Sequence, residues 1–115
     1  MTEKRKIGDL GESMVVDYLK ENGYEILDRN YLKPYGEVDI IAFINEIVCF
    51  VEVKARKSVK FGYPREAVGY HKQQRIIKAS QSYLMENGMT DYIMRFDVAE
   101  VFIESRKINY IENAF

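Results

Sequence analysis

Residues 37–54 read EVDIIAFINEIVCFVEVK, and this stretch decides the fold. It contains two runs rich in β-branched and aromatic residues, 37–44 and 47–54, which predict two β-strands. Only Asn45 and Glu46 lie between the runs, so we expect a tight antiparallel hairpin. The hairpin is the centre from which the rest of the chain is interpreted.

Each strand of this hairpin carries an acid inside apolar sequence. A two-residue turn places Asp39 directly opposite Glu52, and Lys54 shares a face with Glu52 because side chains alternate along a strand. Like charges directly opposite one another destabilise a sheet. A divalent cation between the carboxylates resolves the conflict, because Mg²⁺ uses carboxylate oxygens together with water and substrate phosphate. The alternative is a solvent-facing patch in which Lys54 pairs with an acid and no metal binds. Hairpin geometry alone leaves both open.

Apolar periodicity and breaker residues predict the elements around the hairpin. A first helix is expected at 8–22, with Asp9 as its N-cap and Gly23 as its stop. The remaining expectations are a strand at 24–27, a loop at 28–36, a basic loop at 55–63, a helix at 64–87 starting at Pro64, a strand at 92–103, a turn at 106–107 and a strand at 108–111. The order α-β-β-β-α-β-β is that of a mixed α/β domain, and the length predicts one domain over residues 1–115.

Two helical residues bear on the acid pair. Glu12 lies on the same stripe of the first helix as Gly8 and Val15, so it is either an ordinary surface charge or a third acid delivered to the sheet. Lys72 lies in the middle of an apolar sector of the second helix. It either extends along the surface to reach water or points into a phosphate-binding pocket.

Composition excludes several classes of protein. The single cysteine rules out an internal disulfide and a multi-cysteine zinc site, and a single histidine rules out a histidine-rich one. No apolar run approaches the roughly 18–20 residues of a membrane span, and the stretch MTEKRKIGDLGES lacks the apolar segment of a signal peptide. We therefore expect a cytoplasmic protein without a membrane partner.

The net charge of −1 hides a strong segregation of charge. Residues 54–78 carry eight basic side chains and one acidic side chain, a net of +7, whereas residues 1–53 carry −5 and residues 79–115 carry −3. Clustered basic side chains bind polyanions by displacing counterions, but they also form solvated helix faces and loops. Charge alone does not choose between a phosphate-binding surface and a solvated one.

The central residues match a known pattern. Asp39, a gap, and then Glu52-Val53-Lys54 resemble the D…ExK signature of the restriction-endonuclease-like nucleases. Further segments resemble the YraN-like family of uncharacterised bacterial proteins. These are Gly11-Glu12, Tyr18-Leu19, Gly23-Tyr24, Ile26-Leu27, Arg29-Asn30, 36–41, 50–54 with Arg56, Lys72, Arg75-Ile76, Tyr83-Leu84 and 95–98. The match spans roughly residues 8–101.

The resemblance implies a restriction-endonuclease-like fold, a central mixed sheet flanked by helices, like that of the archaeal Holliday junction resolvases. Those enzymes hydrolyse phosphodiester bonds with Mg²⁺. By position, Asp39, Glu52 and the Val53 carbonyl would be the metal ligands, Lys54 the catalytic lysine and Glu12 the helix carboxylate that completes the site. The YraN-like family itself contributes no established activity, and a fold does not fix a function.

Together these features predict a Mg²⁺- or Mn²⁺-dependent endonuclease that acts on DNA, with recognition of shape or branching rather than of bases. The nucleic-acid backbone would be contacted by Arg56, Lys57, Lys60, Lys72, Arg75 and Lys78. A homodimer would bring two such sites to two strands. Two alternatives stay open: a non-catalytic nucleic-acid-binding module, and a partner-binding domain of a cytoplasmic complex.

Overall fold

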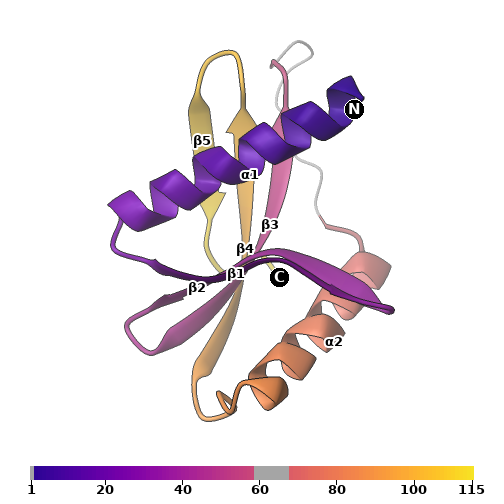
Figure 1. The fold of residues 1–115 in the computed structure, drawn as a ribbon, viewed down its shortest axis with the longest axis vertical. Helices are drawn as coiled ribbons and strands as arrows, with labels where there is room; N and C mark the ends of the chain where they lie inside the picture. The colour runs from indigo at the N-terminus through magenta and orange to yellow at the C-terminus, as the bar shows by residue number, and fades with distance from the viewer. Residues whose placement is uncertain (1, 59–67) are drawn as a thin grey trace.

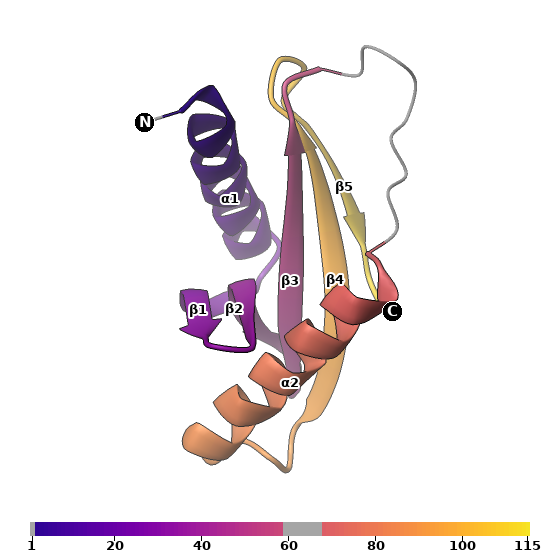
Figure 2. The same ribbon diagram turned by 90° about the vertical axis from the view of Figure 1, so that its right-hand side faces the viewer.

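The protein folds around one five-stranded mixed sheet with a helix on each face (Figures 1 and 2). The computed structural model describes residues 2–58 and 68–115. The elements are α1 (Glu3–Glu21), β1 (Glu25–Lys33), β2 (Gly36–Ile44), β3 (Ile47–Arg56), α2 (Tyr70–Glu86), β4 (Ile93–Phe102) and β5 (Lys107–Ile111). The predicted α/β class and the order α-β-β-β-α-β-β are confirmed, and the arrangement is consistent with a restriction-endonuclease-like fold.

The strands lie in chain order across the sheet, β1-β2-β3-β4-β5. Every neighbouring pair is antiparallel except β3 and β4, which are parallel. A parallel pair needs a crossover connection, and α2 lies within it. Figure 2 shows α1 and α2 on opposite sides of β3 and β4.

The predicted hairpin register is confirmed from the turn to Ile40 and Val51, but the ladder stops there, so Asp39 and Glu52 are not paired directly opposite each other. Ile44 pairs with Ile47, and the ladder continues to Ile40 opposite Val51. Both turn residues have positive φ, 48° at Asn45 and 68° at Glu46, as a type I′ turn requires. Successive side chains of β3 therefore alternate between the α1 face and the α2 face of the sheet.

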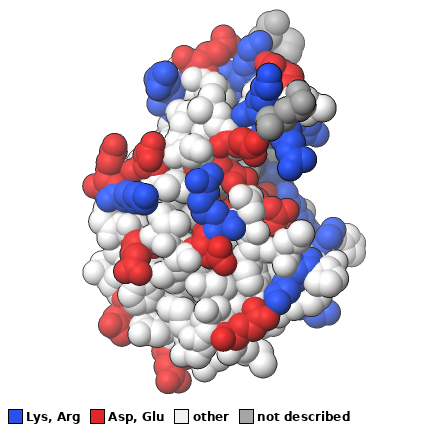
Figure 3. All heavy atoms as spheres, in the orientation of Figure 1, with Lys and Arg blue, Asp and Glu red and all other residues white. Residues whose placement is uncertain are grey.

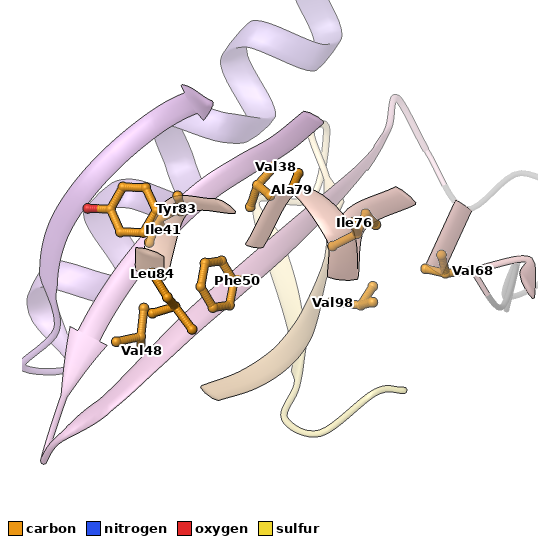
Figure 4. Packing of buried hydrophobic residues seen from close by; sticks show 10 residues of the cluster. All are labelled: Val38, Ile41, Val48, Phe50, Val68, Ile76, Ala79, Tyr83, Leu84 and Val98. Atoms are coloured by element: carbon orange, nitrogen blue, oxygen red, sulfur yellow. The ribbon is translucent and has the colours of Figure 1, made fainter. Parts of the chain in front are cut away.

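Each face of the sheet has its own apolar core. On one face Phe50, Ile41 and Val48 pack against Ile76, Tyr83 and Leu84 of α2 (Figure 4). On the other, Val15 and Leu19 of α1 pack against Ile40, Val51 and Val101. Because apolar layers cover both faces, any polar side chain in the centre of β3 or β4 must find a partner or a cavity.

Two glycines allow the helices to approach the sheet closely. A Cβ atom at Gly36 would overlap the backbone carbonyl of Arg75 in α2. A Cβ atom at Gly11 would lie 2.7 Å from the Cβ atom of Ala55, closer than side chains pack. Gly36 thus brings α2 to the start of β2, and Gly11 brings α1 to the end of β3.

The prediction for the first helix was wrong at its start. The helix α1 begins at Glu3, and its N-cap is Thr2, whose Oγ1 accepts the Arg5 N–H at 3.2 Å. Asp9 lies inside the helix and caps nothing. The first turn is charged and exposed, so it lacks the apolar periodicity that predicts helix from sequence.

The loop predicted at 28–36 is wrong except at 34–35, which form a turn, because β1 continues to Lys33 and β2 begins at Gly36. The strand has a register shift between Ile26 and Asp28, and Asn30 has a φ of 52°. Leu27 and Tyr31 nevertheless pack on the α2 side of the sheet. A polar edge strand with an irregular register carries few of the signals that predict a strand.

The second helix starts at Tyr70, after an extended Gly69 at the N-cap, rather than at Pro64. Pro64 itself lies outside the described residues. The predicted strands at 92–103 and 108–111 match β4 and β5 to within one residue. In the described part of the chain, neither helix is long and apolar enough to cross a membrane.

Candidate active site

The site begins where β2 and β3 separate. Their ladder ends at Ile40 and Val51, and beyond it the Asp39 side chain takes the place of a strand partner. Its Oδ2 accepts the Val53 N–H at 2.8 Å. The N–H and C=O groups of a strand residue point to the same edge, so the Val53 carbonyl faces the side on which Asp39 lies.

Asp39 and Glu52 line one cavity of about 450 Å³. They lie on the same face of the sheet, as the register predicted. The other lining residues come from the start of β2 and the first turns of α2: Gly36, Glu37, His71, Lys72, Arg75 and Ile76. The acids of β2 and β3 thus face the basic side chains of α2 across the cavity.

The pKa of Asp39 departs strongly from that of an ordinary carboxyl. Burial, and next the negative charge of Glu52, raise the pKa of Asp39 to about 7, although the hydrogen bond from Val53 opposes this. Glu12 and Glu37 raise the same pKa more weakly. A carboxyl with this pKa is partly protonated near neutral pH, and an arriving cation displaces the proton because the cation favours the ionised form.

Glu52 is the most deeply placed acid of the site. Its side chain is 8% exposed, and its Oε1 lies 2.7 Å from the Nζ atom of Lys72, whose own side chain is 53% exposed. The buried carboxylate therefore has a cationic partner that comes from α2 and extends to solvent.

Lys54 belongs to a second hollow that adjoins the first, which we call the basic groove. It has a volume of about 640 Å³ and lies between the start of α1 and the end of β3. Among the described residues, the groove is lined by Glu3, by Glu52 and by five cationic side chains: Lys4, Lys54, Arg56, Lys57 and Lys72. Glu52 and Lys72 line both hollows, so they mark the boundary between the acidic cavity and the basic groove.

The surface on this side of the molecule is visibly basic. In Figure 3, Lys and Arg side chains gather along the right-hand side of the view, from the upper end of β3 toward α2. The rest of the face is largely uncharged, with separate acidic groups and a few basic ones. The charge segregation of the sequence is thus preserved in space.

Glu12 lines neither hollow. Its side chain is 14% exposed, and its carboxylate lies 4.0 Å from the Arg29 guanidinium. Burial raises its pKa, while Asn30 and Arg29 lower it. Within residues 2–58 and 68–115, no three side chains of the Asp, Glu, His or Cys type gather as a metal-binding group. Glu12 acts on Asp39 through its charge rather than as a neighbour in a three-acid cluster.

Two of the residues predicted to bind nucleic acid have structural contacts with Tyr35. The Nε atom of Arg75 donates to the Tyr35 carbonyl at 3.0 Å. The Nζ atom of Lys78 lies 5.6 Å from the centre of the Tyr35 ring. These contacts hold the β1–β2 turn against α2. Lys57 lies 3.8 Å from Glu3 in an exposed ion pair, and Lys60 lies outside the described residues.

Sequence reasoning missed Lys4, which lies in the acidic N-terminal segment yet lines the basic groove. It also missed Glu100, which is buried and lies opposite Lys54 in the parallel register of β3 and β4. Glu100 accepts a hydrogen bond from Asn109 at 2.7 Å. An acid inside the apolar run of β4 was the available signal, but only the strand order places it beside Lys54.

The segment 95–98, singled out by sequence without a role, builds a separate buried network. Asp97 is 0% exposed and accepts two hydrogen bonds at 2.9 Å from the Arg95 guanidinium. It also accepts the Tyr110 hydroxyl at 2.6 Å and the Asn113 N–H at 3.1 Å. Burial and the hydrogen bond to Asp97 raise the pKa of Tyr110. The network ties β5 and the C-terminal residues to β4, away from both hollows.

The comparisons with known proteins cover nearly the whole chain. The model of the uncharacterised protein family UPF0102 matches residues 11–101. The chain belongs to this family. A UPF0102 protein of Alkaliphilus oremlandii is 54% identical over 115 residues, covering 96% of this chain and 98% of its relative. A UPF0102 protein of Clostridioides difficile is 44% identical over 115 residues and covers both chains completely.

Membership of UPF0102 confirms the YraN-like resemblance. The matched region contains Glu12, Asp39, Glu52, Lys54 and both ends of the Arg95–Asp97 contact. The family description supplies no reaction, so any activity must be argued from the side chains of the site.

The chemistry of the site suits a hard divalent cation. Two carboxylates and a strand carbonyl offer oxygen ligands, and Mg²⁺ is commonly held by one or two carboxylates with water and substrate phosphate in the remaining positions. Burial, and next the nearby Glu52 carboxylate, raise the pKa of Asp39, and a bound cation would offset both effects. The residues therefore fit such an ion.

Proposed function

We propose that this UPF0102 protein is a divalent-metal-dependent nuclease that hydrolyses phosphodiester bonds of DNA. The observation that supports the proposal most is the shared cavity of Asp39 and Glu52, directly beside a groove lined by Lys54 and four other cations. Acids that hold a metal and bases that hold a phosphate are the two parts that such a reaction needs.

Asp39, Glu52 and the Val53 carbonyl would hold the ion, Mg²⁺ or Mn²⁺. When bound, such an ion supplies an activated water and neutralises charge on the phosphate oxygens. The Val53 N–H fixes one oxygen of Asp39, which leaves the other oxygen to face the cavity. The β3 backbone thus orients both carboxylates before a substrate arrives.

Lys54 would act on the phosphate from the groove side. It lies two residues after Glu52, on the same face of β3, so its ammonium and the Glu52 carboxylate emerge side by side. A positive charge at this place stabilises the negative charge that develops on the phosphate. It also orients a water molecule hydrogen-bonded to it.

The DNA backbone would follow the basic groove toward the acid pair. Lys4 and Lys57 lie at its outer part, and Lys72 lies at the boundary with the cavity. Contacts to phosphates position a nucleic acid without specifying its sequence. We therefore propose recognition of DNA shape, with branched DNA as the first substrate to test.

A cleavage assay tests the proposal. The protein is incubated with four-way, flapped, single-stranded and duplex DNA, with Mg²⁺ or Mn²⁺ and with EDTA. We expect metal-dependent cutting that is lost in Glu52→Gln and Lys54→Ala and kept in Glu104→Gln, a matched change at an exposed acid of the β4–β5 turn. Equal cutting by all variants would identify a contaminant and contradict the proposal.

The second candidate function is a non-catalytic nucleic-acid-binding module. The basic groove favours it, since the groove would bind DNA whether or not the acids hold a metal. Salt-dependent DNA binding without cleavage of any substrate in the same assay would favour this alternative.

A further inference from the structure

The ion pair between Lys72 and Glu52 occupies the carboxylate that the proposed metal needs. The two charged atoms are 2.7 Å apart, and the exposure of the partners is very unequal, 8% for Glu52 and 53% for Lys72. A carboxylate with so little exposure requires a compensating cation. A lysine that is half exposed regains water when it leaves.

Lys72 lies at the boundary between the two hollows. It lines the acidic cavity and the basic groove alike, and its long side chain rotates freely about four bonds. Arg75, one turn further along α2, is less free, because its Nε atom donates to the Tyr35 carbonyl. Lys72 is therefore the α2 cation best placed to move between the two hollows.

We propose that Lys72 is an exchangeable counter-ion of Glu52. It holds the Glu52 carboxylate when no divalent cation is bound, and it is released to a DNA phosphate in the basic groove when a cation takes its place. This inference rests on the proposed function, and it makes metal binding and DNA binding depend on each other through one side chain. Such coupling is reciprocal: the metal strengthens DNA binding by the factor by which DNA strengthens metal binding.

Calorimetric titration of Mn²⁺ into the DNA-free protein tests the first half of the inference. Removing the competitor in Lys72→Met raises the Mn²⁺ affinity, by about fivefold or more if the pair has a typical coupling energy. Lys20→Met, the same change at an exposed lysine of α1, lies outside both hollows and leaves the affinity unchanged. Lys72→Arg keeps the positive charge and therefore binds Mn²⁺ no more tightly than the wild type. This variant keeps the test valid if Lys72→Met folds poorly.

A second measurement tests the release of Lys72 to phosphate. Binding of a fluorescein-labelled four-way DNA junction is followed by anisotropy in the Lys54→Ala background, in which the proposed function keeps the probe uncut. Adding Lys72→Met leaves the affinity in EDTA unchanged and lowers the affinity in Mg²⁺ several-fold. A loss of equal size under both conditions would overturn the inference, because Lys72 would then contact DNA without any exchange.

The outcomes separate the inference from the proposed function. Equal Mn²⁺ affinity in the wild type and Lys72→Met, with cleavage intact, overturns the exchange and leaves the nuclease assignment standing. Absence of Mn²⁺ binding that depends on Glu52, tested with Glu52→Gln, overturns the metal site itself and the inference with it.

Discussion

The Asp39 carboxylate accepts the Val53 N–H at 2.8 Å, just beyond the last paired residues of β2 and β3. One side chain thus completes the hydrogen bonding of a diverging strand and also faces an acidic cavity. The hydrogen bond explains why an acid is tolerated there. Burial, and next the charge of Glu52, explain why its ionisation is unfavourable.

Replacement of Asp39 by asparagine separates the hydrogen bond to Val53 from the cost of ionising the carboxyl. In the folded protein its pKa is about 7, against 3.8 ordinarily, so the folded state holds the proton more tightly than the unfolded chain does. Protonation of Asp39 therefore contributes to the free energy of unfolding. This contribution is fully present below about pH 4 and is lost as the pH rises through 7. The asparagine side chain keeps an acceptor for the Val53 N–H and does not ionise.

The expected result is that Asp39→Asn gains stability relative to the wild type between pH 5 and pH 8, measured as the difference in urea unfolding free energy in EDTA. Titrating groups that do not interact with Asp39 cancel in this difference. Parallel pH profiles for the two proteins would contradict the shifted pKa.

Gly36→Ala tests the close approach of α2 to the start of β2. The added Cβ atom would overlap the Arg75 carbonyl oxygen, so α2 or the β1–β2 turn must move. We expect a loss of about 1–3 kcal/mol in unfolding free energy. In the matched change Gly8→Ala, the new atom meets nothing within 4 Å and stabilises the helix by about 0.5–1 kcal/mol. Losses in both variants would argue against a specific contact at Gly36.

The buried Asp97 network predicts large and ordered effects on stability. Asp97→Asn removes the charge that pairs with Arg95 inside the protein, and we expect a cost of about 3–5 kcal/mol. Tyr110→Phe removes a single hydrogen bond to Asp97 and should cost about 1–2 kcal/mol. The exposed Asp91→Asn is the control, with a change within about 0.5 kcal/mol. If Asp97→Asn changed the unfolding free energy as little as Asp91→Asn does, the Asp97 network would not stabilise the fold as proposed.

The basic groove predicts which lysines of α1 contact DNA. Lys4→Gln should weaken binding of a four-way junction and reduce the slope of log affinity against log salt by about 0.9, because one phosphate contact is lost. Lys20→Gln, at the other end of the same helix and outside the groove, should change neither quantity. Equal losses for both lysines would indicate nonspecific attraction rather than the groove.

The features that sequence predicted best are those set by local alternation. The hairpin register follows from the apolar pattern and a two-residue turn, and these local features suffice to place Asp39, Glu52 and Lys54 on one face. The positions that sequence missed depend on tertiary packing. Lys4 reaches the groove only because Gly11 lets α1 lie against Ala55.

Charge patterns were the less precise guide. Arg75 and Lys78 belong to the basic segment, yet both contact Tyr35, which sequence placed in a loop. The strand β1 leads into the turn that packs against α2. This strand is polar and irregular, so the contacts of the turn could not be predicted from periodicity. The basic segment predicts a phosphate-binding surface, but the contacts of its individual cations depend on the fold.

The most direct test of the central claim is a crystal of the wild-type protein soaked in Mn²⁺ and measured at the manganese absorption edge. The account predicts an anomalous peak at about 2.1–2.3 Å from a carboxylate oxygen of Asp39 and of Glu52, with the Lys72 ammonium displaced from Glu52. A soaked crystal with no peak between these carboxylates, and with Lys72 still paired to Glu52, would contradict it.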